Sequence, residues 1–197
     1  MKRGKKKGTH GVKGMYREAG EAIRKSRGFV ACIAGVFAAS MLYGFVFPEQ
    51  FAFFNEMLRN ILKESEGLSG ASLFAYIFLN NLQSAFLGIA LGIVFGVFPL
   101  LVTLVNGSLI GYVLRLSWEQ AGVREFWRLL PHGVFELPAV FLALALGLRL
   151  GMFMFEQEKL AALRERGRDA AWVFALIIVP LLVIAAIIET WLIAIAG

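Results

Sequence analysis

Apolar residues in this chain gather in five long runs, and the shorter stretches between them carry most of the charge. At about 1.5 Å per residue, each run is long enough to cross the roughly 30 Å hydrocarbon core of a bilayer as a helix. The second and third runs are separated only around Gly96–Pro99, which predicts a tight hairpin, although a single kinked or re-entrant element fits the same pattern. The predicted spans are Phe29–Phe47, Leu73–Phe95, Val97–Leu116, Gly133–Phe155 and Trp172–Ala196.

Composition supports lipid as the solvent of this chain. Of its 197 residues 58% are apolar, whereas soluble domains hold about 45–50%. We therefore expect an all-α, polytopic transmembrane helix bundle of about five spans, with interfacial amphipathic helices in its outer loops. Residues 1–28 form a basic N-terminal segment and residues 29–197 form the bundle.

The placement of positive charge predicts the orientation. Net charge is +6, and ten of the twenty Lys and Arg residues lie in the first 27 positions. Beside a membrane span, such a tail favours anionic lipid on the cytoplasmic side over nucleic acid. With the N-terminus inside, the inner segments hold fourteen basic residues and the two outer loops hold four. We expect a multi-pass protein of the cell membrane with a cytoplasmic N-terminus and an extracytoplasmic C-terminus.

The connecting segments are themselves patterned. Apolar residues recur at helical spacing in Pro48–Glu66, and Ser117–Leu130 carries aromatic residues suited to the headgroup zone. Both segments are interpreted as interfacial anchors, with a docking face for an outside partner as the alternative. On the inner side, residues 12–23 predict a basic amphipathic helix, and Gln157–Arg168 is expected to extend the fourth span as a charged helix.

Small residues recur four apart in several spans. In lipid such rows let helix backbones approach closely, which favours bundling within the chain and also a homo-oligomer such as a dimer. The rows are Ala31-Gly35-Ala39, Gly88-Gly92-Gly96, Gly107-Gly111 and Ala143-Gly147-Gly151.

Polar residues also lie at membrane depth, where each is costly unless it is paired. Counting along the predicted helices places Glu136 roughly 5 Å deep, Glu189, Asn80 and Asn81 roughly 11 Å, and Asn106 about 15 Å from the outer surface. Arg149 is nearer the inner end and is expected to extend toward cytoplasmic headgroups. The full set is Asn80, Asn81, Gln83, Asn106, Glu136, Arg149 and Glu189.

The outer polar groups have two interpretations. They could hydrogen-bond one another and fix which helices are neighbours, or they could line an outward cavity that binds an ion, a proton, a lipid headgroup or a partner helix. His132 lies four residues before Glu136, the spacing of one helix face, and with Glu189 could ligate a metal. An interfacial histidine explains it better, so we predict no metal site, no cofactor and no catalytic residue.

The stretch Leu130-Pro131-His132-Gly133-Val134-Phe135-Glu136-Leu137-Pro138 resembles the stage II sporulation protein M family. The pairs Asn80-Asn81 and Glu189/Trp191, the row Gly88-Gly92-Gly96 and Asn106-Gly107-Ser108 extend the resemblance from the first span to the last. It implies a multi-pass bundle without established catalytic activity. In endospore-forming bacteria, the family's namesake is a scaffold that recruits secreted peptidoglycan-degrading enzymes during engulfment. Family-typical positions are Asn80, Asn81, Asn106, His132, Gly133, Glu136 and Pro138, whereas the basic tail has no counterpart.

Three functions therefore stay open at this point. The first is a non-enzymatic scaffold for cell-envelope or membrane remodelling, with membrane lipids, a second copy and other envelope proteins as partners. The second is a small transporter or channel subunit with an outward polar cavity. The third is an intramembrane hydrolase that uses His132 and Glu136.

Overall fold

The computed structural model describes residues 11–94, 96–121 and 126–196, and nearly all of them are helical, without a strand in those ranges. Five of its helices are long and apolar enough to cross a membrane, which confirms the expected all-α fold with five spans. The helices are α1 (Val12–Val46), α2 (Phe54–Ser65), α3 (Gly70–Ala90), α4 (Val97–Ala121), α5 (Phe126–Gly151), α6 (Lys159–Val173) and α7 (Val179–Ala196).

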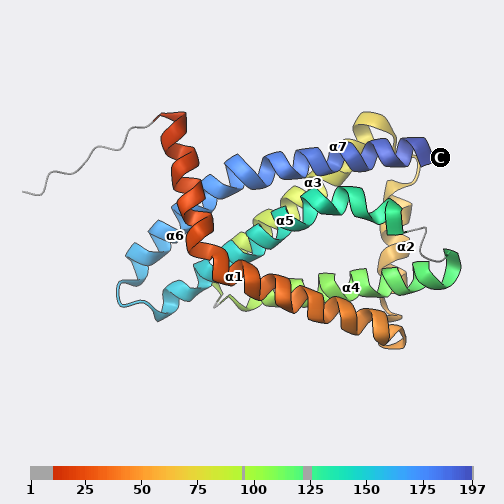
Figure 1. Cartoon of the computed structure of the whole chain (residues 1–197), viewed down its shortest axis with the longest axis horizontal. Coiled ribbons are helices and arrows are strands. Elements are labelled where there is room, and N and C mark those ends of the chain that lie inside the picture. The colour runs from red at the N-terminus through yellow and green to blue at the C-terminus, as the bar shows by residue number, and fades with distance from the viewer. Residues whose placement is uncertain (1–10, 95, 122–125, 197) are drawn as a thin grey trace, which may run out of the picture.

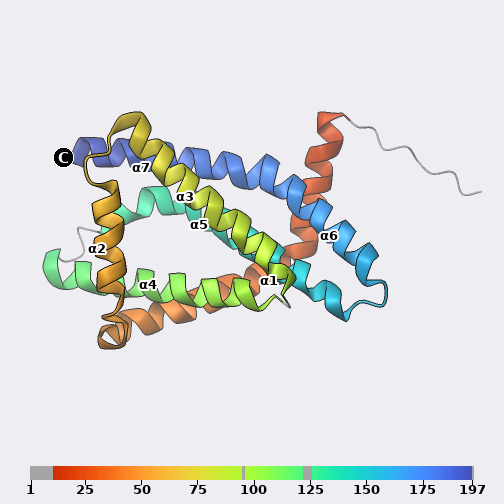
Figure 2. The same cartoon turned by 180° about the vertical axis from the view of Figure 1, so that it is seen from behind.

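The spans form two groups that lie along one common axis (Figure 1). α1 packs most extensively against α4, while α3, α5 and α7 pack against one another, and α5 joins the groups by contacting both α1 and α4. At one end α2 crosses the axis between the groups (Figures 1 and 2), and we call this the α2 end. The opposite, basic end holds the first turns of α1, the α5–α6 connection (152–158) and α6.

Glycines set the contact between α1 and α4. A Cβ added at Gly111 would lie 2.8 Å from the Met41 carbonyl carbon and 2.9 Å from the Phe45 amide nitrogen. One added at Gly107 would lie 2.7 Å from the Phe37 carbonyl oxygen. These distances are shorter than real Cβ contacts, so only glycine lets the two backbones approach this closely.

A second close contact, between α3 and α5, is built in the same way. A Cβ at Gly92 would meet the Gly147 backbone, one at Gly151 would lie 2.7 Å from the Gly96 Cα, and one at Gly88 would lie 2.9 Å from the Leu144 side chain. Gly96 also adopts a φ of +69°, a left-handed conformation that glycine reaches without steric cost. The same residue therefore makes the α3–α4 hairpin tight and lets α5 pass beside it.

The row Ala31-Gly35-Ala39 was expected to pack within the bundle, and that expectation was wrong. All three residues are exposed, and a Cβ at Gly35 would have no atom within 4 Å. α1 instead turns Ser40 and Gly44 toward α4 and the Phe37 ring toward Phe141 of α5, and all three are buried. Four-residue spacing marks a face that permits close approach, but it does not say which face meets a neighbour.

α1 bends, so that its first turns cross the basic end and the remainder runs along the bundle (Figures 1 and 2). The hydroxyl of the buried Ser26 donates to the Ala22 carbonyl oxygen at 2.8 Å, a bond that tends to bend helices. On the crossing part Ala19 and Ala22 are fully buried, while Lys13, Arg17 and Arg24 are exposed. This is the basic amphipathic helix that the sequence predicts for residues 12–23.

The charged segment Gln157–Arg168 does not extend the fourth span, which corrects the expectation. α5 ends at Gly151, a 3₁₀ turn follows over Met152–Phe155, and Glu156 is extended with ψ of 152°. The charged residues belong to α6, which runs through a π-helical turn (Phe174–Ile178) into α7. Pro180 stands just after this turn, where it lacks the amide hydrogen of a regular helix, and both features are known sites of helix bending.

Replacing Gly111 with Ala should destabilise the bundle, because the added methyl group meets the α1 backbone rather than a mobile side chain. We expect a loss of about 1–3 kcal/mol, the usual cost of overpacking. Thermal unfolding of the detergent-solubilised protein, followed by circular dichroism, measures it. The matched control is Gly20→Ala, an exposed position of α1 whose added methyl group enters open space. Equal unfolding midpoints for the two variants would contradict the assigned helix contact.

Candidate functional site

Two carboxylates of different spans approach each other near the α2 end. Glu136 belongs to α5 and Glu189 to α7, and their charges lie close enough to interact. Each glutamate lies one helical turn beyond buried residues on the same face of its helix. These residues are Ala143 and Ala139 before Glu136 on α5, and Leu182 and Ala185 before Glu189 on α7. The α5–α7 contact that forms the core therefore ends in a pair of acids.

Asn81 of α3 follows the buried face of its helix. α3 and α5 run in the same direction (Figures 1 and 2), and they are in register where Gly88 meets Leu144 and Gly92 meets Gly147. Asn81 is half-buried in the row formed by Ile77 and Ala85, so it belongs to the face that packs against α5 and α7.

The other polar residues are distributed differently. Asn80 and Gln83 are exposed on another face of α3. Asn106 is half-buried on α4, one turn beyond Val102, which packs against the α5 residues Leu144 and Leu148. The backbone of His132 belongs to α5, but its side chain lies outside the described residues. The structure thus brings the charges of Glu136 and Glu189 within reach of each other, and it leaves Asn80 exposed.

The chemistry of this group follows from its charges. Two nearby carboxylates of neighbouring spans repel each other, so a cation or a hydrogen-bond donor between them is favoured. An amide such as Asn81 can both donate and accept hydrogen bonds. Among the described residues no group of three or more His, Cys, Asp or Glu side chains could hold a metal ion.

α2 lies over this end of the bundle and is attached to both groups of spans. Near its start Asn55 accepts a hydrogen bond from the Tyr112 hydroxyl of α4 at 2.9 Å, and the buried Phe54 packs against the Tyr112 ring. Near its end Glu64 accepts one from the Tyr76 hydroxyl of α3 at 3.0 Å. α2 therefore ties α4 to α3 where the two groups of spans separate. In the second outer segment, residues 117–121 form the end of α4 and residues 126–130 form the start of α5. Residues 122–125 lie outside the described part of the chain.

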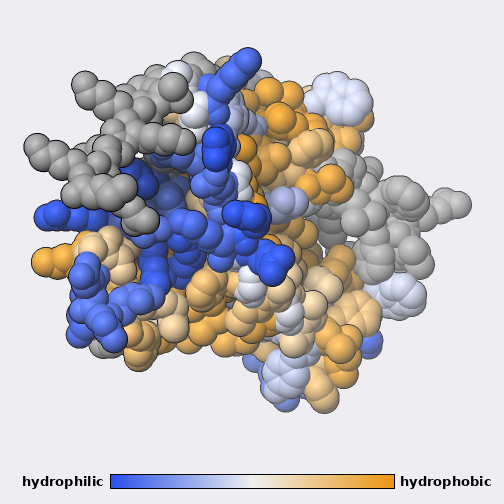
Figure 3. All heavy atoms as spheres, turned by 60° about the vertical axis from the view of Figure 1, so that its left-hand side comes forward, coloured by the Kyte–Doolittle hydropathy of each residue, from blue (hydrophilic) through white to orange (hydrophobic). Residues whose placement is uncertain are grey.

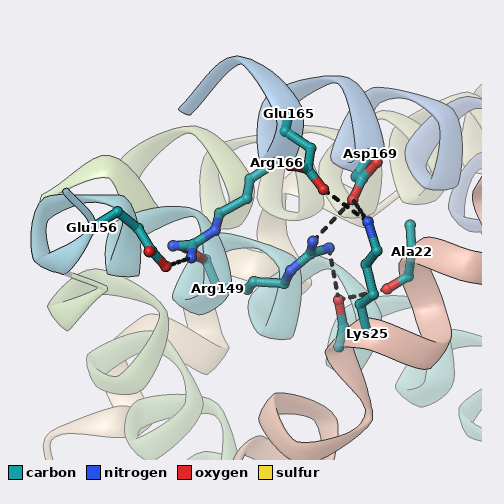
Figure 4. A network of polar contacts seen from close by, with 8 residues as sticks. Ala22, Lys25, Arg149, Glu156, Glu165, Arg166 and Asp169 are labelled. Atoms are coloured by element: carbon teal, nitrogen blue, oxygen red, sulfur yellow. Dashed lines mark hydrogen bonds and ion pairs between the residues drawn. The ribbon is translucent and has the colours of Figure 1, made fainter. Parts of the chain in front are cut away.

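A second polar group, at the basic end, was missed by sequence reasoning. Arg149 is only 7% exposed, and its guanidinium donates to the Asp169 carboxylate at 2.9 Å and to the Ser26 hydroxyl at 3.4 Å (Figure 4). The expectation that Arg149 extends to the headgroups was therefore wrong. The sequence did offer a signal, because Arg149 stands in an apolar run. Its partner Asp169, however, lies 20 residues further along the chain, in α6. The sequence did not show that α6 folds back beside α5.

Further ion pairs continue this group toward the surface. Lys25 of α1 contacts Glu165 at 2.8 Å and Asp169 at 3.9 Å, and Arg166 pairs with Glu156 and donates to the Arg149 carbonyl oxygen at 3.1 Å. The hydrogen bond from Lys25, together with its charge, lowers the pKa of the Glu165 carboxyl, which lies in the charged part of α6. α1, α5 and α6 are thus connected by alternating charges.

The fold and its two polar ends define a multi-pass helical membrane protein. Residues 29–192 match the sequence profile of the family described as stage II sporulation protein M. The chain therefore belongs to this family, as the sequence motifs suggested. No curated protein and no solved structure shows a significant match to the chain.

Replacing Arg149 with Met should destabilise the fold, because it leaves the Asp169 carboxylate buried without its closest cation. Breaking a buried pair costs about 3–5 kcal/mol, and we expect the lower part of this range because Lys25 stays near. The double variant Arg149→Met/Asp169→Leu should regain most of the loss in unfolding measured by circular dichroism.

The control is Arg17→Met, which removes one member of an exposed pair whose side chains are 81% and 48% exposed. Such pairs contribute about 0–1 kcal/mol. If Arg149→Met were as mild as Arg17→Met, the buried pair would not be the connection described here.

Proposed function

We propose that this protein is a non-enzymatic membrane scaffold or assembly protein of the stage II sporulation protein M type, acting in cell-envelope or membrane remodelling. The observation that carries the proposal is α2, a helix fixed across the α2 end by Asn55–Tyr112 and Glu64–Tyr76. A surface helix held at both ends is a pre-organised platform, and pre-organisation lowers the entropic cost of binding a partner. Its outward residues Glu56, Arg59 and Lys63 are exposed.

The orientation follows the distribution of positive charge. Figure 3, which brings the basic end forward, shows hydrophilic residues gathered there and hydrophobic residues over much of the remaining visible surface. Lysines and arginines of α1 and α6 supply the positive charge of this end. By the positive-inside rule the basic end is cytoplasmic, and the α2 end is extracytoplasmic. α2 would then meet partners outside the membrane.

Family membership supports the kind of partner. In spore formers, the resemblance implies recruitment of peptidoglycan-degrading enzymes, and more generally it implies another envelope protein. The exposed face of α2 carries both signs of charge, which suits a polar protein surface and sets specificity more than affinity. A second copy of the chain is a further partner, since the exposed small residues Ala31, Gly35 and Ala39 permit close approach in lipid.

A photo-crosslinking residue at position 59 of α2 should capture an envelope protein in native membranes, because Arg59 is on the exposed face. The same residue at position 168 of α6, where Arg168 is also exposed, is the matched control and should not capture that protein. The charge reversal Lys63→Glu should reduce the position-59 product by about tenfold, a difference of 1.4 kcal/mol. Mass spectrometry of the product identifies the partner, and gel densitometry measures its yield.

Two outcomes would contradict the scaffold. Identical products at positions 59 and 168 would show that capture does not depend on α2. Proton or cation flux in liposomes containing the purified protein, abolished by Glu136→Gln, would instead favour the rival function of a transporter or channel subunit. The Glu136–Glu189 interaction is the observation on which that rival rests.

A further inference from the structure

A cavity opens at the basic end, away from the Glu136–Glu189 pair and from α2. Its volume is about 810 Å³, within the usual 300–1,000 Å³ of small-molecule sites. Lys25 contributes from α1 and Arg149 from the end of α5, and the remaining wall belongs to the α5–α6 connection and the first turns of α6. The cavity therefore lies against the ion-pair group drawn in Figure 4.

The lining of this cavity carries charges of both signs in equal number. Its cations are Lys25, Arg149 and Arg166, and its carboxylates are Glu156, Glu158 and Glu165. Such a wall does not favour a simple anion over a simple cation. It complements a ligand that carries one positive and one negative group a short distance apart.

Some of these charges can exchange partners at small cost. The side chains of Lys25 and Glu165 are 48% and 52% exposed, and ion pairs in contact with water contribute only about 0–1 kcal/mol. A lysine has three hydrogen-bond donors, so Lys25 can keep its contact with Glu165 and also bind a phosphate. The deeper Arg149–Asp169 pair holds the helices together and needs no rearrangement.

The rim of the cavity is apolar on one side. Phe155, which lines the cavity, is 70% exposed, and Leu160 at the start of α6 is equally exposed. Both belong to the basic end of the bundle, beside the connection between α5 and α6. Large apolar side chains exposed beside a charged cavity suit a ligand with a charged head and hydrocarbon tails.

We propose that this cavity binds the headgroup of a phospholipid that carries a phosphate and a primary ammonium group, in the leaflet at the basic end. Lys25 and Arg166 would meet the phosphate, and Glu158, with Glu156, would accept hydrogen bonds from the ammonium. The acyl chains would pass along Phe155 and Leu160. A trimethylated headgroup of the same net charge would bind less well, because it has no N–H to donate to the carboxylates.

Native mass spectrometry of the delipidated full-length protein tests this with phosphatidylethanolamine, phosphatidylcholine and phosphatidylglycerol of identical acyl chains. Phosphatidylethanolamine should bind about tenfold more tightly than the other two, the ratio expected for one hydrogen bond to a charged group. Ala161→Phe places a ring where Ala161 lines the cavity and should weaken this binding by about tenfold. Glu158→Gln should reduce the preference over phosphatidylcholine.

The matched control is Ala171→Phe, an exposed position on the same helix outside the cavity lining, which should leave binding unchanged. Circular dichroism checks that all variants fold. Equal affinity for the three lipids, or full binding by Ala161→Phe, would overturn the proposal. Glycerophosphoethanolamine, the same headgroup without acyl chains, is the last arm: binding of this soluble probe as tight as that of the lipid would overturn the lipid assignment, while weaker binding supports it.

Discussion

The structure depends on close backbone contact between helices at glycine. Lipid tails are as apolar as the side chains of the spans, so burial alone does not hold helices together in a bilayer. Contact at Gly107 and Gly111 joins α4 to α1, and contact at Gly88 and Gly147 joins α3 to α5. With α5 touching both groups, these two contacts set how α1, α3, α4 and α5 lie against one another.

Polar side chains make different contacts at the two ends of the bundle because the helices are arranged differently there. At the basic end α6 returns beside α5, so Arg149 and Asp169 form a buried pair in which each ion has a partner of opposite sign. At the α2 end the two groups of spans are joined through α2 and its hydrogen bonds to Tyr112 and Tyr76. One end is thus fixed by charge, and the other presents a surface helix.

Much of this could be predicted from the sequence, because length and apolarity alone mark a membrane span. The amphipathic pattern of Pro48–Glu66 likewise predicted α2, although the helix itself begins only at Phe54, and glycine spacing indicated close contacts. The facing of helices could not be predicted: Ala31, Gly35 and Ala39 have the right spacing, yet α1 uses Ser40 and Gly44. Arg149 was misjudged for a related reason, since its partner Asp169 belongs to a charged run that resembled an extension of the preceding span.

The central claim is that the two ends face different compartments, with α2 outside and α6 inside. Labelling of single cysteines with a membrane-impermeant maleimide in intact cells tests it directly, on a background in which Cys32, the only cysteine, is replaced by Ala. Asn60→Cys on α2 and Arg164→Cys on α6 are both at exposed positions. We expect position 60 to react in intact cells and position 164 to react only after permeabilisation. The reverse order of reactivity would contradict the account.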